Sequence, residues 1–189
     1  MMMADLVRSC RTIRRYRQDQ AISRETLVEL VDMARIVASG SNKQGLKYWL
    51  SSDPETNACI FPMLAWAGYM RDWDGPEEGE RPAAYVIILG DKLLGDGFGV
   101  DHGIAAQTIA LAAAEKGIGT CMIGSVQRIK LREQLSIPDR FDILLVLALG
   151  IPGEQVKIEE IRADDTRYWR DADGVHHVPK RSLDDVIVH

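Results

Sequence analysis

A cluster of arginines near the start of the chain is the clearest group of residues that could do chemistry. Residues 11–17, RTIRRYR, place four arginines in seven positions, with a threonine among them. Guanidinium groups and a hydroxyl together suit the oxygens of a phosphate. A solvated basic surface is the plainer interpretation of the same run. The residues alone leave both interpretations open.

The stretch from residue 101 to 126, DHGIAAQTIALAAAEKGIGTCMIGSV, could hold backbone donors against a flat ligand. Small and apolar residues without proline predict a helix that is buried on several sides. Gly117 stands where a helix C-cap is expected. A short apolar run, 120–123, then fits a strand that ends in a turn at Gly124 and Ser125. The bend would give N–H groups a fixed place beside a planar ring, although an ordinary capped core helix explains the pattern equally simply.

Other polar groups in the chain point less clearly to a site. The segment 38–45, ASGSNKQG, is rich in hydrogen-bonding side chains but also suits a helix-to-strand connection. His176 and His177 are adjacent, so in a strand they point to opposite faces, which predicts two partly exposed histidines and no shared metal site. The three cysteines are far apart and form no CxxC, so the sequence indicates neither a disulfide framework nor a zinc site.

Composition describes an ordinary globular protein. The chain has 189 residues, of which 46% are hydrophobic and 27% charged, with a net charge of −5. The acidic balance gives no reason to expect nucleic acid or an anionic membrane as a partner. No apolar run has the length of a membrane span. Cysteine usage and the absence of an apolar signal-peptide core lead us to expect a cytoplasmic protein.

Hydrophobic periodicity predicts an α+β fold of three layers, with a mixed or antiparallel central sheet between helices, in one domain over 1–189. A long central helix is expected in the middle of the chain. The C-terminal part after 150 is polar and is expected to be mostly irregular. The expected helices are a short one ending near 10, then 23–37, 57–70, a long one in the first part of 101–126 that ends at the cap Gly117, and 129–135. The expected strands are 46–53, 83–89, 120–123, 141–150 and 175–178.

Four motifs in this order resemble those of the FMN-dependent nitroreductase family. CRTIRRY at 10–16 is similar to the family's opening R-R-S-x-R-x-F/Y motif, and ASGSNKQGL at 38–46 is similar to its P-S-x-x-N-x-Q-P-W loop. DHGIAAQ at 101–107 matches a D-x-G-x-A-x-Q helix, and GIGT at 117–120 matches a G-[LI]-G-T motif that leads into a strand. The resemblance covers nearly the whole chain and implies the nitroreductase-like fold with its long helix at a dimer interface.

The resemblance also implies a set of cofactor-binding residues and no catalytic acid–base pair among the side chains. The implied FMN contacts fall into four groups along the chain: Arg11, Thr12 and Arg14 at the phosphate and ribityl end; Ser39, Asn42 and Gln44 on the flavin of the partner subunit; Met122, Ile123, Gly124 and Ser125 beside the isoalloxazine; and Lys180 and Arg181 closing on the phosphate. The implied activity is an NAD(P)H oxidoreductase. It would work as a homodimer by ping-pong hydride transfer at flavin N5 to a nitroaromatic, a quinone or another small electrophilic acceptor.

The sequence also departs from the family pattern. Cys10 stands where the first arginine is usual, Ala38 where proline is usual, and residues 45–46 where Pro–Trp is usual. Gly124 replaces an often acidic residue near N5. These changes open the pocket around the flavin. The alternatives are therefore a family member with other flavin chemistry, such as dehalogenation or enone reduction, and a non-catalytic flavin-binding protein.

Overall fold

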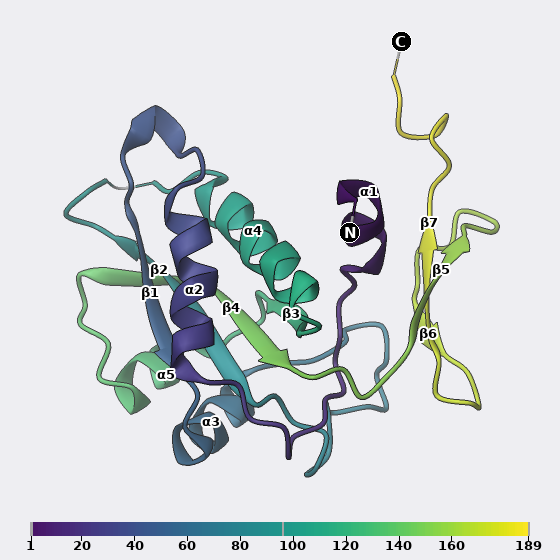
Figure 1. Cartoon of the computed structure of the whole chain (residues 1–189), viewed down its shortest axis with the longest axis horizontal. Coiled ribbons are helices and arrows are strands. Elements are labelled where there is room, and N and C mark those ends of the chain that lie inside the picture. Colours follow the sequence, from purple (N-terminus) through teal and green to yellow (C-terminus); the bar gives the residue numbers. More distant parts are fainter. Residues whose placement is uncertain (1, 96, 189) are drawn as a thin grey trace.

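A computed structural model of the chain describes residues 2–95 and 97–188. Its centre is an antiparallel sheet of four strands in the order β1-β2-β4-β3 (Figure 1). The strands are β1 (Leu46–Ser51), β2 (Ala84–Asp91), β3 (Gly119–Ile123) and β4 (Phe141–Gly150). β2 is buried along its whole length, as its continuous apolar sequence predicts for a strand covered on both faces. The sheet is antiparallel throughout, which resolves the mixed-or-antiparallel expectation.

Helices cover both faces of this sheet, so the three-layer expectation is confirmed. Alternate residues of β2 enter two separate apolar clusters, because neighbouring side chains of a strand point to opposite faces. α2 (Arg24–Arg35) and α4 (Asp101–Glu115) pack on one face. α3 (Pro54–Ile60), the 3-10 turn η2 (Phe61–Met63) and α5 (Arg128–Gln134) lie on the other.

The long helix and its glycine end follow the sequence closely. α4 begins at Asp101, and Gly117 adopts the left-handed conformation after it, with φ of 73°. The Ile118 N–H then donates to the Ala113 carbonyl at 2.9 Å, which completes the C-cap. Among the described residues, no helix is long and apolar enough to cross a membrane.

The helix expected over 57–70 is wrong in both bounds. α3 begins three residues earlier because Asp53 caps it, with its carboxylate accepting the Thr56 N–H at 2.8 Å, and Pro54 occupies its first turn. The helix ends at Ile60, one residue before the 3-10 turn that holds Pro62. A proline has no N–H for the helical ladder, so the aromatic residues that follow continue as a loop.

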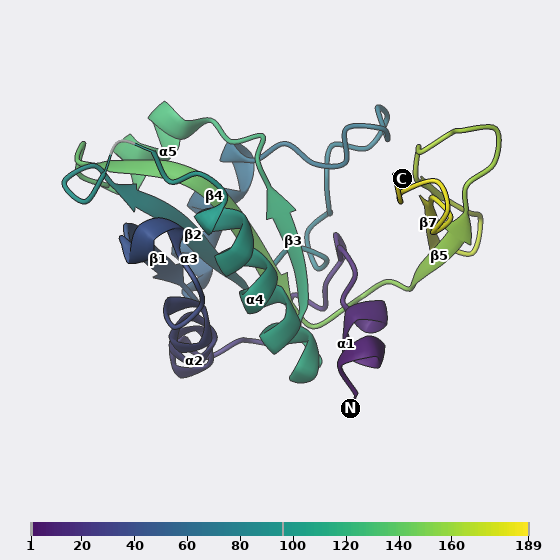
Figure 2. The ribbon, with the colours of Figure 1, turned by 90° about the horizontal axis from the view of Figure 1, so that it is seen from above.

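The C-terminal part forms a second sheet, which corrects the expectation of mostly irregular chain. β5 (Val156–Glu160) pairs in parallel with β7 (His176–Lys180), and β6 (Trp169–Arg170) pairs antiparallel to β7. Figure 2 shows this sheet standing apart from the four-stranded one, with the helix α1 (Met3–Ser9) between α4 and the second sheet. The expected strand 175–178 is confirmed as β7. The expected exposure of His176 is wrong, because its side chain is completely buried.

Candidate functional site

The arginine-rich segment lies along the edge strand of the main sheet. Thr12 forms a parallel bridge with Thr120 of β3, and the Ile13 N–H donates to the Thr120 carbonyl at 2.9 Å. The approach is close at Gly119, where an added Cβ would lie 2.7 Å from the Ile13 side chain. The fold therefore brings two of the predicted groups, the segment 11–14 and the segment 122–125, to the same edge of the sheet.

The three predicted phosphate contacts on this segment point in different directions. Thr12 is exposed, and the Arg11 guanidinium donates to the Val7 carbonyl at the end of α1 at 2.6 Å. The Arg14 guanidinium turns toward the second sheet, 3.1 Å from His176 Nε2 and over the Tyr168 ring. The Nε atoms of both arginines are buried and have no hydrogen-bond partner among the described residues. Thr12 and Arg11 are thus the side chains of this motif best placed for a ligand.

The bend after β3 presents backbone donors to solvent. Met122 is exposed and Ile123 is buried in the core. An added Cβ at Gly124 would meet no heavy atom within 4 Å. In the described chain, the N–H groups of Gly124 and Ser125 donate to no acceptor, while the Ser125 carbonyl accepts the Ala65 N–H at 2.9 Å and so fixes the bend. The backbone at Gly124 is therefore open to an approaching group.

The third predicted group lies at the start of α4, whereas Arg11 lines a cavity with Ala110 and Ala114 near the end of that helix. The 3-10 turn η1 (Gly40–Asn42) lies in the loop that leads from α2 to β1 (Figure 1). Ser39, Asn42 and Gln44 surround a short 3-10 turn, which α4 holds through a 2.9 Å hydrogen bond from the Gly40 N–H to Asp101. The described contacts do not join these three residues to the segments 11–14 or 122–125.

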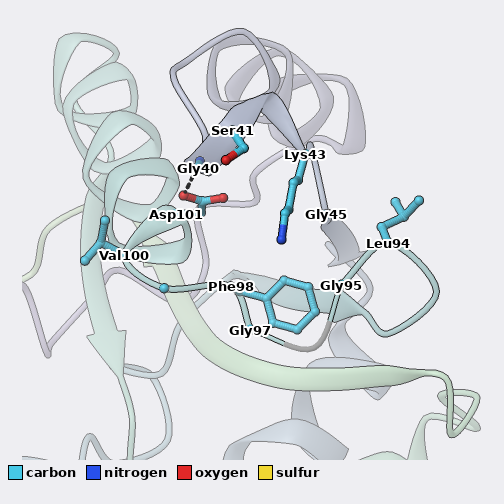
Figure 3. Close-up of a pocket in the computed structure, with 11 residues that line it drawn as sticks. Gly40, Ser41, Lys43, Gly45, Leu94, Gly95, Gly97, Phe98, Val100 and Asp101 are labelled. Carbon is cyan, nitrogen blue, oxygen red and sulfur yellow. Dashed lines mark hydrogen bonds between the residues drawn. The ribbon is translucent and has the colours of Figure 1, made fainter.

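A cavity of about 260 Å³ opens beside this turn, between residues 40–45 on one side and residues 94–95 and 97–101 on the other. Figure 3 shows the Lys43 side chain pointing into it toward the ring of Phe98, with Asp101 on the opposite side. Ser41, Asn42 and Gln44 all have positive φ, between 51° and 53°. That conformation is uncommon outside glycine and clusters at functional loops.

The basic pair at the end of β7 is the fourth predicted group. Arg181 forms an ion pair with Asp164, and the Lys180 carbonyl accepts the Ile161 N–H at 3.0 Å. Both side chains are exposed. Neither contacts Arg11 or Thr12 in the described chain. One protomer therefore presents the predicted residues as separate groups.

A buried polar cluster between the two sheets was missed by the sequence reasoning. Its centre is Glu154, which accepts hydrogen bonds from the N-terminal segment and from Arg170 at 2.7 Å. Arg170 also lies over the Trp73 ring at 4.9 Å, so the segment between η2 and β2 is anchored here. Burial, and then the positive charge of Arg14, lowers the pKa of His176 to about 4. The only sequence signal was an acidic residue directly after the turn that follows β4.

His177, on the opposite face of β7, has the reverse environment. Its two ring nitrogens lie 2.8 Å from Glu159 and 2.9 Å from Asp171, and its ring stacks on Trp169. Both carboxylates accept, so the doubly protonated ring satisfies both contacts, and the hydrogen bonds to Asp171 and Glu159 raise the pKa of His177. Among the described residues, no group of three or more His, Cys, Asp or Glu side chains is arranged to hold a metal ion.

Comparison with known proteins decides the family. The sequence model of the nitroreductase family matches residues 7–72 and 79–151, which include the arginine-rich segment, the loop before β1, α4 and β3. The chain belongs to the nitroreductase family. A relative from Bacillus subtilis (strain 168), named "Putative NAD(P)H nitroreductase YodC", is 23% identical over 176 residues, covering 77% of this chain and 87% of the relative.

Solved structures confirm the nitroreductase-like fold. An FMN-dependent nitroreductase from Clostridium difficile R20291 superposes with a TM-score of 0.67 at 21% identity, over 86% of this chain and 92% of that one. A protein from Desulfovibrio desulfuricans solved in complex with FMN gives a TM-score of 0.64 at 23% identity, over 79% and 86% of the two chains. These likenesses establish that the chain shares their fold.

Proposed function

We propose that this member of the nitroreductase family is an FMN-dependent NAD(P)H oxidoreductase. The observation that carries the proposal is the bend at Gly124 and Ser125, where two N–H groups that donate to no acceptor in the described chain follow β3, the strand whose Thr120 bridges Thr12. Family membership and two solved relatives, one described as FMN-dependent and one in complex with FMN, support the same cofactor. FMN supplies the hydride chemistry when it is bound.

The residues of the chain fit the phosphate end of such a cofactor. The hydroxyl of Thr12 and the guanidinium of Arg11 are donors suited to a phosphate dianion. The buried Arg11 Nε has no partner among the described residues, so it has a hydrogen bond still to give. Arg14 holds the second sheet in this structure, and Lys180 and Arg181 would approach the phosphate from that sheet.

The bend 122–125 fits the ring end. Backbone N–H groups there can donate to ring acceptors and stabilise negative charge that develops on them. The open space at Gly124 leaves room for the second substrate over the same ring, so donor and acceptor would use one site in turn. Ping-pong kinetics follow from this shared site. The acceptor in the proposal is a nitroaromatic, a quinone or another small electrophile.

A homodimer would complete the site. In one protomer, the described contacts do not join Ser39, Asn42 and Gln44 to the other predicted residues. We propose that these three residues contact the cofactor of the partner subunit. α4 supports this arrangement, because it is apolar on nearly all sides while Ile104 remains 38% exposed in one chain. All three cysteines are free, which fits the proposed action in a reducing cytoplasm.

The visible absorption spectrum of the purified protein tests the proposal. A flavin spectrum that bleaches with NADH or NADPH under nitrogen, and returns when a nitroaromatic or quinone is added, is the expected result. A flavin that neither nucleotide reduces would favour the non-catalytic flavin-binding protein, which Cys10 in place of the usual arginine also favours. A bleached flavin that no nitroaromatic or quinone restores would favour other chemistry, such as dehalogenation or enone reduction. A protein that takes up no FMN would refute the cofactor assignment.

A further inference from the structure

Glu154 is a buried carboxylate that uses both of its oxygens. Its side chain is 1% exposed. One oxygen accepts the backbone N–H groups of Arg14 at 2.5 Å and Arg15 at 3.1 Å. The other accepts from the Arg170 guanidinium at 2.7 Å. A carboxylate is costly to bury, so such a group persists where several donors satisfy it.

The first pair of contacts fixes the backbone of the arginine-rich segment. The Gly153 N–H donates to the Arg15 carbonyl, and the Arg17 N–H donates to the Ile151 carbonyl, each at 2.8 Å. Together with the bridge from Thr12 to β3, these bonds hold the segment on both sides. The direction in which the Arg11 and Thr12 side chains leave the chain is therefore set partly by Glu154.

The second contact fixes the other basic group. Arg170 belongs to β6, which pairs with β7 at His176. β7 continues from there to Lys180, and Arg181 follows. One carboxylate is thus hydrogen-bonded both to the segment that carries Arg11 and Thr12 and to the sheet that carries Lys180 and Arg181.

We infer that Glu154 is a positioning residue for recognition of the cofactor's phosphate. It touches neither the phosphate nor the ring in this arrangement and acts through the two basic segments that it joins. This inference rests on the proposed function, because it concerns the same FMN site.

Electrostatics alone predicts the opposite outcome, which makes the inference testable. Removing a negative charge near an anion site strengthens anion binding. Loss of positioning weakens it, since the donors no longer converge on the phosphate. The sign of the change in FMN affinity therefore separates the two effects. Riboflavin, which has the same ring without the phosphate, reports whether the ring end remains intact.

The experiment compares FMN and riboflavin binding to the full-length protein after its flavin has been removed, by quenching of flavin fluorescence. Glu154→Gln keeps the shape and one acceptor but faces Arg170 with an amide. The expected result is an FMN Kd about tenfold higher, the scale of one lost charge-assisted hydrogen bond, with a riboflavin Kd changed by less than about twofold. Glu154→Asp, which keeps the charge but shortens the reach, should shift the FMN Kd in the same direction by less.

Asp91→Asn is the matched control. Asp91 is equally buried and also pairs with an arginine, Arg140, but it lies at the end of β2 away from the arginine-rich segment. Its FMN-to-riboflavin preference should equal that of the wild type. If Glu154→Gln does not fold, the Glu154→Asp titration decides in its place.

Four outcomes would overturn the inference. If Glu154→Gln bound FMN more tightly, the electrostatic effect alone would explain the change. If the binding of FMN and of riboflavin weakened equally, Glu154 would have only a structural role. An unchanged FMN-to-riboflavin preference in both Glu154 variants would refute the positioning role while the proposed function stands. A wild-type protein that binds neither flavin would refute the proposed function itself, and the role of Glu154 with it.

Discussion

Replacing His176 with glutamine should reduce the loss of folding stability that the protein undergoes as the pH falls below 7. His176 is completely buried, and its Nε2 lies 3.1 Å from the Arg14 guanidinium. Because a guanidinium only donates, the ring must accept there as the neutral form. Protonation would bury a second cation beside Arg14, with Arg170 also nearby. Glutamine offers an acceptor without a titration, so His176→Gln removes the pH dependence while keeping a partner for Arg14.

The magnitude follows from the pKa of about 4 in the folded state against about 6.5 in an unfolded chain. A histidine with a lowered folded pKa favours folding above its unfolded pKa, and this contribution is lost as the pH falls from about 6.5 toward about 4. Over the whole range the loss approaches about 3 kcal/mol, at about 1.4 kcal/mol per pKa unit. Between pH 7 and pH 5 it amounts to about 2 kcal/mol.

Urea unfolding at pH 7, 6 and 5, followed by circular dichroism at one protein concentration, measures this difference. The free energy of unfolding of the wild type should fall by about 2 kcal/mol more than that of His176→Gln between pH 7 and pH 5. His177→Gln is the matched control on the other face of β7. Its raised folded pKa gives a contribution present below the unfolded pKa and lost as the pH rises through the folded value, so its difference from wild type should grow as the pH falls.

Parallel curves for the wild type and His176→Gln would refute this reasoning. They would mean that His176 has the same pKa in the folded and unfolded states. The contact with Arg14 would then carry no preference for the neutral ring.

Three further substitutions test other parts of the structure. Arg11→Ala should raise the FMN Kd about tenfold or more, since it removes a charged donor to the phosphate, and full FMN occupancy of the purified variant would contradict that role. Gly119→Ala should lower the free energy of unfolding by about 1–3 kcal/mol, because the new Cβ would lie 2.7 Å from the Ile13 side chain; an unchanged thermal midpoint would contradict the close approach. Tyr85→Phe should leave stability unchanged or raise it by up to about 1 kcal/mol, because the buried Tyr85 hydroxyl has no partner in the described residues; a large loss of stability would show a hidden partner.

The central sheet and its helices could be predicted because local sequence carries the information. β4 is itself a run of ten consecutive residues that are almost all apolar. α4 ends just before Gly117, which takes the left-handed conformation that its place in the sequence suggests. The second sheet could not be predicted in this way. β5 and β7 are polar strands that pair in parallel although β6 and its loops separate them in the sequence. The buried His176 contacts Arg14, which lies 162 residues away in the chain. Periodicity reports which face of an element is apolar, and it says nothing of partners so distant.

The candidate site divides in the same manner. The motif residues are predictions from the sequence, and the structure pairs Thr12 of the first motif with Thr120 of β3, the strand that leads to residues 122–125. The orientation of Arg14 toward His176 and the buried carboxylate of Glu154 came only from the fold. Buried polar groups are recognised by their contacts, and a sequence shows only that a polar residue is present.

The loop before β1 carries a consequence for the thermodynamics of binding. Three of its residues, Ser41, Asn42 and Gln44, have left-handed backbone dihedrals. Hydrogen bonds within the protein, which need no ligand, hold the loop in this shape. The conformational cost of that shape is met when the chain folds, so a molecule that binds there has little ordering left to impose. Association at this loop should accordingly show a small entropic penalty and little structural rearrangement. The same feature makes the loop sensitive to β-branched substitutions, which disfavour these dihedrals even where no contact is lost.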